Sequence, residues 1–404
     1  MDYINGTDVD KFWLTSDLLR VTFPYLLLIS ITGFCGAILN SYDQFAVPAV
    51  TPVFLNITLI LAAVIASPWF DQPVYALAWG VLTAGCIQLV FQVPFLLRLG
   101  LMPHPKVDWS DESVRKVLKL MAPAMFGVSV SQINLLLDTV LASFLPEGSI
   151  SWLYFSDRLV ELPLGVFGVG IATVILPNLS RQFAKGGERF SDTIDWSIRM
   201  VLLISVPATL ALVILAQPLL FTLFQYDKYA VSDVYMASMS MQAYALGLTA
   251  FMLIKVLASS FFSRQDTKTP VKIGIIAMAS NMVLNLIFVL PLHFIWQIGH
   301  VGLAFATSVS AFLNAGLLYR HLRKQDVYIL GLGWRKFMLQ LLLACTAMTA
   351  VLLVLMQILP GLEGRGWLQR VQILAIFVVS GGFAYLLTLM LSGLRLKHLK
   401  LHLN

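Results

Sequence analysis

Charged side chains are scarce in this sequence. Aspartate, glutamate, lysine and arginine together make up 12% of the 404 residues, whereas hydrophobic residues make up 58%. Soluble domains carry about 25% charged residues on average. The low charge excludes an ordinary soluble enzyme or binding domain, and it predicts an integral membrane protein.

Residues for metal binding and covalent chemistry are also few. The three cysteines, Cys35, Cys86 and Cys345, are isolated, with no CxxC motif and no histidine at metal-ligand spacing. His398 and His402 are four residues apart, the spacing of two ligands on one helical face, but no third ligand accompanies them. No nucleophile is accompanied by a plausible general base. We therefore predict no metal site, no cofactor and no enzymatic activity.

Long apolar runs fill most of the chain. A helix needs about 20 apolar residues to cross a hydrocarbon core of roughly 30 Å, and eleven segments meet this requirement. They cover approximately residues 17–40, 46–69, 73–97, 117–145, 151–179, 196–217, 234–262, 270–292, 300–319, 337–359 and 368–392. The predicted fold class is an all-α integral membrane protein with about eleven transmembrane helices.

The basic residues between these segments alternate from loop to loop. Arginine and lysine cluster in every second loop, at residues 98–119, 181–189, 264–272, 320–336 and 395–400. Since cytoplasmic loops carry the excess of basic residues, we expect the amino terminus outside and the carboxyl terminus in the cytoplasm. The net charge of +6 then reflects topology and contact with lipid head groups, not nucleic-acid binding. Residues 1–16 contain no signal sequence, so we expect further helices before Met1.

One stretch of the sequence is repeated in outline roughly 220 residues later. Asn40–Gln44 followed by Pro48 resembles Ser263–Asp266 followed by Pro270, and each proline opens an apolar segment that contains asparagine. The asparagines are Asn56, Asn281 and Asn285. Transporters are often built from duplicated bundles, although proline at a helix start is favoured in any protein.

Asp157, Arg158 and Glu161 form an ionic cluster inside the apolar segment 151–179, and Pro163 follows closely. A charged group near the bilayer centre costs on the order of 3 kcal/mol on insertion scales, and such residues mark a binding site or pathway by default. On a helix, Arg158 can pair with Glu161. The cluster is then either a self-neutralised helix end near the outer interface or a guanidinium in a water-filled cavity. In a cavity, the planar guanidinium suits a phosphate or carboxylate.

Two further charged residues lie within apolar segments. Lys255 precedes Arg264 by nine residues, which places it about 13 Å from the cytoplasmic turn at 1.5 Å per residue. It either snorkels to the interface or lines the cavity. Asp138 lies deep in its segment, and we interpret it as a candidate proton or cation site.

Polar residues crowd the predicted cytoplasmic turn Ser263–Lys272. Arg264, Asp266, Lys268 and Pro270 fall within it. The turn is either a solvated loop that caps the next helix, or a latch of a cytoplasmic gate that also contacts lipid head groups.

Three stretches carry a family resemblance: Gly127–Gln132, Ser156–Leu159 and Ser263–Lys272. They resemble the MurJ (MviN) lipid II flippases closely, and the resemblance covers essentially all 404 residues. It implies a fold of fourteen helices, in two bundles of six plus two, within the multidrug/oligosaccharidyl-lipid/polysaccharide exporter superfamily. The eleven segments then look like helices four to fourteen, so that the chain is expected to lack the first three.

The resemblance also implies a domain organisation. Residues 1–100 would form the remainder of an amino-terminal bundle, with three helices, and residues 101–325 a carboxyl-terminal six-helix bundle. Residues 326–404 would contribute two additional helices, which form a groove for a lipid tail, and a basic cytoplasmic tail.

The implied function is alternating-access transport of lipid II, the undecaprenyl-diphosphate-linked precursor of peptidoglycan. It would move from the inner to the outer leaflet of the bacterial inner membrane. Arg158 would face the diphosphate, with Ser151, Asp157, Glu161 and Lys255 around the same cavity. The membrane potential or a coupled cation would drive the cycle. The expected partners are lipid II, membrane lipids and proteins of cell-wall synthesis.

Three alternatives stay open. A drug or polysaccharide-unit exporter of the same superfamily would share the fold, although Arg158 and the turn Ser263–Lys272 favour the peptidoglycan branch. A membrane enzyme acting on lipid-linked sugars should show clustered acidic residues at a membrane face or a metal site, and the sequence shows neither. A non-transporting scaffold of the cell-wall machinery should tolerate the loss of Arg158.

Overall fold

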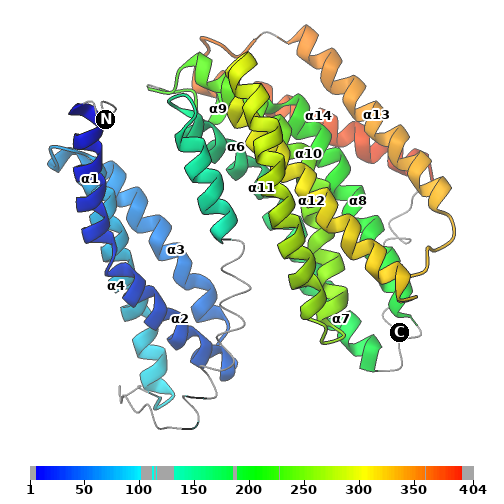
Figure 1. Ribbon diagram of the computed structural model, residues 1–404, viewed down its shortest axis with the longest axis horizontal. Helices are drawn as coiled ribbons and strands as arrows, with labels where there is room; N and C mark the ends of the chain where they lie inside the picture. Colours follow the sequence, from blue (N-terminus) through cyan, green and yellow to red (C-terminus); the bar gives the residue numbers. More distant parts are fainter. Residues whose placement is uncertain are drawn as a thin grey trace. The chain divides into compact units, whose positions relative to one another are not determined.

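The computed structural model describes residues 6–101, 112, 115, 132–184, 189–226, 228–359 and 361–393. Within these residues every regular element is a helix (Figure 1). The chain divides into two compact units, Met1–Arg115 and Lys116–Asn404. The prediction of an all-α fold is confirmed, whereas the division of the second unit at residue 325 stays a prediction.

Nine helical stretches within the described ranges are long and apolar enough to cross a membrane, and they coincide with nine of the eleven predicted spans. They are Phe12–Ser41, Ala46–Trp69, Val74–Arg98, Phe190–Ile214, Val231–Phe262, Lys268–Trp296, Gly299–Lys324, Trp334–Ile358 and Trp367–Leu391. The predicted span 117–145 is described only from residue 132, where a helix runs to residue 143. Residues 127–131 of the motif Gly127–Gln132 lie outside the described residues.

The predicted span 151–179 is helical throughout but is not among the nine. It consists of α6 (Ser149–Pro163), the π-helical turn η3 (Leu164–Val169) and α7 (Gly170–Ala184). Proline has no amide hydrogen, so Pro163 interrupts the α-helical hydrogen bonds at the junction.

The first unit consists of α1 (Gly6–Thr22), α2 (Tyr25–Ser41), α3 (Ala46–Leu61) and α4 (Val74–Arg98). Pro24 stands between α1 and α2, where it cannot continue the hydrogen bonds of the preceding helix. A small apolar core joins the last three helices: Cys35, Leu39, Val47 and Leu96. Close packing depends on Gly85, since a Cβ there would lie 2.8 Å from the Tyr25 ring.

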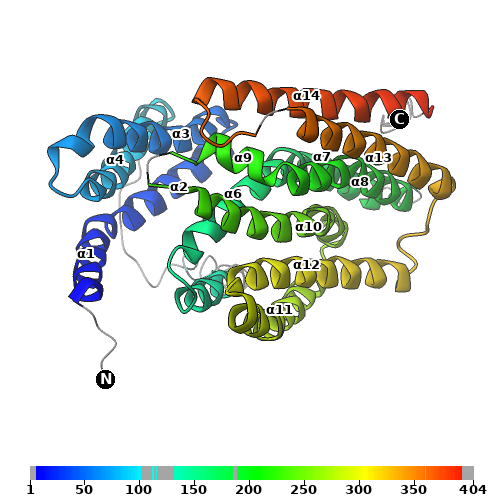
Figure 2. The same ribbon diagram turned by 90° about the horizontal axis from the view of Figure 1, so that it is seen from above.

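Helix α10 (Val231–Phe262) is the centre of the second unit. It packs against α6, α7, α8 (Phe190–Ile214), α9 (Ala216–Leu223) and α12 (Gly299–Lys324). In the view from above, α10 lies between the layer of α7 and α8 and the pair of α12 and α11 (Lys268–Trp296) (Figure 2). A Cβ on Gly247 would lie 2.6 Å from Ser308 Oγ of α12. Close approach through small residues is typical of helix packing in membranes.

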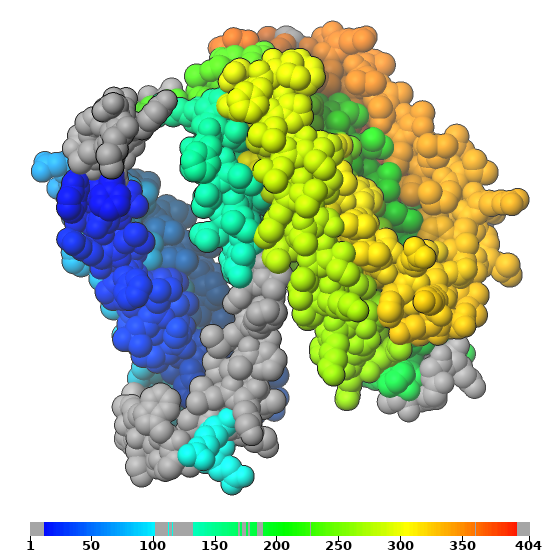
Figure 3. All heavy atoms as spheres, viewed as in Figure 1, coloured from blue at the N-terminus to red at the C-terminus, as the bar shows by residue number. Residues whose placement is uncertain are grey.

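Helices α11 and α12 run along each other on the face shown in Figure 3. On the other side of the unit, α13 (Trp334–Ile358) and α14 (Trp367–Leu391) pack along each other and against α8 and α9. The Tyr385 hydroxyl of α14 donates to the Leu203 carbonyl of α8 at 2.7 Å. Thus α14 is hydrogen-bonded to the rest of the unit as well as packed on it.

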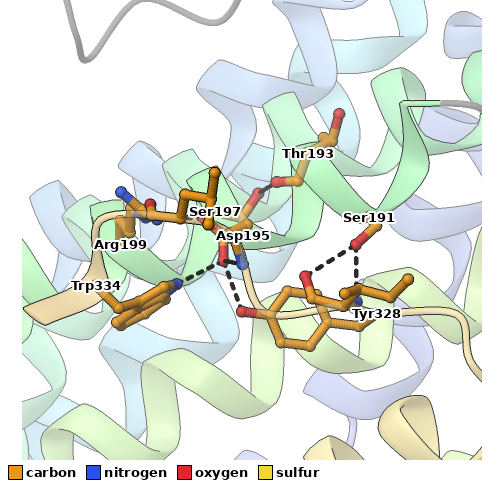
Figure 4. Close-up of polar contacts among 10 residues, drawn as sticks. Ser191, Thr193, Asp195, Ser197, Arg199, Tyr328 and Trp334 are labelled. Atoms are coloured by element: carbon orange, nitrogen blue, oxygen red, sulfur yellow. Dashed lines mark hydrogen bonds and ion pairs between the residues drawn. The ribbon is translucent and has the colours of Figure 1, made fainter.

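Asp195 of α8 holds the connector (residues 325–333) that joins α12 to α13 (Figure 4). Its Oδ1 accepts hydrogen bonds from the Tyr328 hydroxyl at 2.7 Å, the Trp334 indole N–H at 2.7 Å and the Gly331 amide at 3.1 Å. Its Oδ2 lies 2.8 Å from Arg199 Nε. Burial, together with the bond to Asp195, raises the pKa of Tyr328 well above its ordinary value, so the hydroxyl stays a donor.

The start of α14 is held by Arg370, whose side chain is buried. The guanidinium donates to the carbonyl oxygens of Phe221 at 2.8 Å and Gln225 at 2.9 Å, where α9 ends. The last carbonyls of a helix have no partner within the helix. Arg370 therefore caps α9 and attaches α14 to it.

The repeated sequence stretch is also repeated in the backbone. Asp43 after α2 and Gln265 after α10, 222 positions apart, both have a φ of 60°. Each donates its amide to the carbonyl three positions earlier, Asn40 at 3.2 Å and Phe262 at 3.0 Å. The two turns thus follow the same path, although neither residue is glycine.

The glycines that follow these turns also correspond. Gly80 of α4 and Gly302 of α12 are 222 positions apart. A Cβ on Gly80 would lie 2.8 Å from the Ala62 Cβ, and a Cβ on Gly302 would lie 2.9 Å from the Phe288 carbonyl carbon. In both copies, glycine lets the third helix approach the second. The series α2, α3, α4 and the series α10, α11, α12 are therefore structural repeats.

Candidate functional site

The charged cluster lies on one face of α6. The helix begins after Gly148, whose φ is 99° and whose Cβ would lie 2.7 Å from the Trp152 ring, so this position requires glycine. The exposed positions recur at the spacing of one helical face: Ser151, Tyr154, Arg158 and Glu161. Asp157 lies half-buried at the edge. We call these five residues the α6 polar face.

Arg158 is paired within the α6 polar face. Its Nη1 lies 2.7 Å from Glu161 Oε2, and the guanidinium carbon lies 5.0 Å from the Tyr154 ring centroid. The two side chains of the ion pair are 57% and 51% exposed. Because a guanidinium has five N–H donors, the pair leaves donors for an anionic ligand. The predicted local pairing with Glu161 is present, and Tyr154 is a contact that we did not predict.

The predicted cation residue Asp138 lies in a network of carboxamides. The Asn285 side-chain amide donates to Asp138 Oδ1 at 2.6 Å, and the Asn134 amide donates to Oδ2 at 3.2 Å. Asn285 also donates to Asn281 Oδ1 at 3.3 Å. Asn281 and Asn285 are each 1% exposed. Helix 132–143 and α11 are thereby joined by polar side chains in an otherwise apolar region.

Lys255 is exposed on α10. Its predicted place in a cavity with Arg158 stays a prediction.

The turn between α10 and α11 is organised by Asp266. Its carboxylate accepts the Thr269 amide at 3.0 Å and the Thr269 hydroxyl at 2.7 Å, which caps the start of α11. Burial alone would raise the pKa of Asp266, but the two Thr269 hydrogen bonds and the Arg264 charge outweigh it and hold the pKa below its ordinary value. Lys268 opens α11 and Pro270 lies in its first turn.

Arg264 connects this turn to α12. Its Nη1 donates to Gln325 Oε1 at 3.0 Å, just beyond the end of α12. The turn is thus both a helix cap and a link between two helices. Its predicted role as a gate latch stays a prediction.

Some polar groups of the second unit carried no signal in the sequence. Asp195 is 133 positions from Tyr328, and Arg370 is 145 from Gln225. By contrast, the sequence could have indicated Asn134 as a partner of Asp138 and Tyr154 as a partner of Arg158. Each lies four residues before the charged residue, a spacing that places two side chains on one helical face.

Comparison with known proteins gives consistent matches along the chain. The family model described as "Lipid II flippase MurJ" matches residues 3–363. A probable lipid II flippase MurJ of Vibrio cholerae is 50% identical over 402 residues, which are 99% of this chain and 75% of that protein. A protein of the same description from Haemophilus influenzae is 48% identical and covers 98% of this chain and 78% of its own length. The match from residue 3 does not support the expectation that the family's first three helices are missing.

A solved structure agrees with the observed fold. A lipid II flippase MurJ in an inward closed conformation superposes with a TM-score of 0.76 and 24% sequence identity. The match covers 95% of this chain and 75% of that chain.

Proposed function

Because this chain belongs to the lipid II flippase MurJ family, we propose that it moves lipid II from the inner to the outer leaflet of the bacterial inner membrane. Members of the family are transporters and not enzymes. The helices long enough to cross a membrane support a multi-pass transporter. Alternating access requires no bond to be made or broken, in agreement with the lack of a catalytic set in the sequence.

The observation that carries this proposal is the exposed pair of Arg158 and Glu161. A charged pair in a membrane segment is stable where water reaches it, as in a transport cavity. A diphosphate offers several anionic oxygens, and the guanidinium fork binds two of them at once. We infer that the diphosphate displaces Glu161 from Arg158, with Ser151, Asp157 and Lys255 lining the same cavity.

The lipid tail needs an apolar surface, and α13 and α14 offer one. Large apolar side chains are exposed along both helices: Leu339, Leu342, Leu343, Val379 and Phe383. Such residues are compatible with a lipid-facing groove. We infer that the tail stays in this groove while the head group crosses the cavity.

The distribution of basic residues supports one orientation. Arg264 and Lys268 lie at the turn between α10 and α11, and Arg335 and Lys336 lie at the start of α13. Both sites belong to the basic clusters that recur in every second loop. The positive-inside rule places these ends in the cytoplasm, the amino terminus outside and the carboxyl terminus inside. Membrane lipids contact these residues through their head groups. Proteins of cell-wall synthesis stay predicted partners.

We infer that Asp138 takes part in coupling. Its carboxylate is surrounded by carboxamides, and Asn285 Oδ1 has no hydrogen-bond partner among the described residues. Carboxylate and amide oxygens are the ligands of hard cations. A membrane potential of 100 mV contributes about 2.3 kcal/mol per elementary charge. Asp138→Asn should therefore slow transport and weaken its dependence on the coupling cation.

The test replaces the resident flippase of a bacterial host with this protein and measures lipid II in the outer leaflet. The wild type should restore transport and Arg158→Ala should not. Arg20→Ala is a matched control, since Arg20 is exposed and paired with Asp17 three positions away at 3.3 Å. If well-expressed Arg158→Ala also restores transport, the proposed role of Arg158 is wrong. Tolerance of this substitution is what the alternative of a non-transporting scaffold predicts. Failure of the wild type would reject the flippase function itself.

A further inference from the structure

Tyr154 lies one turn before Arg158 on the α6 polar face, and it is 54% exposed. The guanidinium carbon of Arg158 lies 5.0 Å from the centroid of the Tyr154 ring. A cation within about 6 Å of an aromatic face is attracted to the ring. Glu161 lies one turn after Arg158, and its Oε2 is 2.7 Å from Arg158 Nη1. The guanidinium is therefore held from both directions along α6, by an aromatic ring and by a carboxylate.

The turn of α6 that carries Tyr154 is fixed to α10. Ser156 is 0% exposed, and its hydroxyl donates to the Ala237 carbonyl of α10 at 2.7 Å. The Trp152 indole N–H donates to Asp233 Oδ1, also of α10, at 2.9 Å. Tyr154 stands between Trp152 and Ser156 in the sequence. The backbone position from which its ring approaches the guanidinium is thus set by hydrogen bonds to a second helix.

The ring of Tyr154 also has a neighbour of its own. It meets the Phe155 ring edge to face, with a centroid distance of 5.6 Å and an interplanar angle of 75°. Phe155 in turn packs against Phe224 at 4.5 Å and Tyr229 at 5.4 Å. Aromatic pairs of this geometry contribute more than their buried area alone. The place of the Tyr154 ring is therefore supported by other aromatic rings, and not only by Arg158.

The two contacts of Arg158 differ in what an incoming anion does to them. Glu161 has a negative charge and occupies one N–H group, so an anionic ligand competes with it for the guanidinium. Tyr154 is neutral, and it attracts the guanidinium through the electron density of its ring face. This attraction uses no hydrogen-bond acceptor. The contact with the ring can therefore persist after the carboxylate has been displaced.

We propose that Tyr154 is a positioning residue for Arg158, a proposal that rests on the function proposed above. A free arginine side chain loses much rotamer freedom when it binds a ligand. A contact that restricts the side chain beforehand lowers this cost. Tyr154 holds the guanidinium in place through the face of its ring, and it does so both before and after the diphosphate displaces Glu161.

An exposed tyrosine on a membrane helix has a second common role. Tyrosines are enriched at the interface between membrane and water, where they anchor helices. An anchor acts on the stability of α6, whatever residue stands at position 158. A positioning residue acts on ligand binding, and only while the arginine is present. A double-mutant cycle that combines substitutions of Tyr154 and Arg158 separates the two roles.

The probe is undecaprenyl diphosphate. Its affinity is measured for the purified protein in lipid nanodiscs, after thermal unfolding has shown that each variant is folded. Tyr154→Leu should weaken binding about two- to fivefold, the value of one exposed cation–π contact. Tyr154→Gln, which also lacks a ring, should act in the same way. Tyr154→Phe keeps the ring and should keep most of the affinity.

The cycle and its control follow from the same contacts. In the presence of Arg158→Ala, which itself weakens binding, Tyr154→Leu should cause no further loss. Tyr235→Leu is the matched control, because Tyr235 is also an exposed tyrosine of the second unit, with its ring edge to face against Phe221 at 6.1 Å. It should leave the affinity unchanged.

The outcomes keep the two proposals apart. If Tyr154→Leu and Tyr154→Gln leave binding unchanged, or weaken it as much beside Arg158→Ala as in the wild type, Tyr154 does not position Arg158. The proposed function then stands, provided that Arg158→Ala weakens binding. If Tyr154→Phe loses as much affinity as Tyr154→Leu, the hydroxyl is responsible and the positioning by the ring is wrong. If Arg158→Ala binds the probe as tightly as the wild type, the diphosphate site of the proposed function is wrong, and the role of Tyr154 fails with it.

Discussion

Arg158 and Glu161 form an ion pair of 2.7 Å across one turn of α6, with both side chains more than half exposed. Glu161 thus occupies part of the guanidinium fork that an anionic ligand would use. The affinity for a diphosphate then depends on how much more strongly the diphosphate binds Arg158 than Glu161 does. An exposed ion pair is worth roughly 0–1 kcal/mol, so a diphosphate can displace the glutamate readily.

Glu161→Gln should strengthen the binding of undecaprenyl diphosphate. Removing the competing charge frees Arg158, and the gain is about two- to fivefold for an exposed pair. The affinity is measured in nanodiscs, with Asp17→Asn as the control that loosens the similar pair with Arg20. Weaker binding by Glu161→Gln would show that the glutamate orients Arg158 instead of competing for it.

Asp195→Asn should destabilise the second unit. The substitution removes the charge that pairs with Arg199. The new NH₂ group must face either the Arg199 guanidinium or the Tyr328 hydroxyl and Trp334 N–H, so one of these sets of donors loses its acceptor. The expected loss is on the order of 3 kcal/mol in the free energy of unfolding. Thermal unfolding in detergent checks it. Asp192→Asn, an exposed site in the first turn of the same helix, should cost less than about 1 kcal/mol; equal effects would contradict the assignment.

Arg370→Met should release the start of α14 from α9. The substitution removes the hydrogen bonds to the Phe221 and Gln225 carbonyls but keeps an apolar stem. We expect faster hydrogen exchange in residues 216–225 and a loss of about 2 kcal/mol in the free energy of unfolding. Arg365→Met changes a half-buried arginine of the preceding loop, whose guanidinium donates to the nearby Gly361 carbonyl at 2.6 Å, and should have a smaller effect. Unchanged exchange near residue 225 in Arg370→Met would show that the cap is dispensable.

The start of α11 should loosen in acid. The pKa of Asp266 is lower in the folded protein than in the unfolded chain, so its contribution to stability is complete above the unfolded pKa. That contribution is lost as the pH falls through the folded pKa, which lies below the ordinary pKa of an aspartate. Hydrogen exchange of residues 268–272 at descending pH measures the effect. Asp266→Asn, which can still cap the helix, should abolish the pH dependence; an unchanged profile would contradict the role of Asp266.

The helices could be predicted because the signal for each span lies within the span itself. A run of about 20 apolar side chains suffices to define a membrane helix, and nine such spans recur in the described structure. The pairing of Arg158 with Glu161 could also be predicted, because a separation of three residues places two side chains on one face. The same holds for the repeated turn, where proline and polar residues mark both copies.

The long-range contacts could not be predicted in this way. Asp195 accepts from Tyr328, Gly331 and Trp334, and nothing near Asp195 in the sequence indicates which distant donors will reach it. Nor does the sequence around Arg370 indicate that it caps α9: it shows only a basic residue at the start of an apolar span.

The π-helical turn Leu164–Val169 ends the α6 polar face, because the residues after it point in other directions around the helix axis. A π-turn holds one residue more than an α-helical turn, and one residue corresponds to about 100° of rotation around the helix axis. Side chains on α7 are therefore out of phase with those on α6, although the two helices form one continuous rod. Deleting a single residue within the turn would bring the side chains of α6 and α7 into phase. It would rotate α7 about the helix axis by about 100° relative to α6.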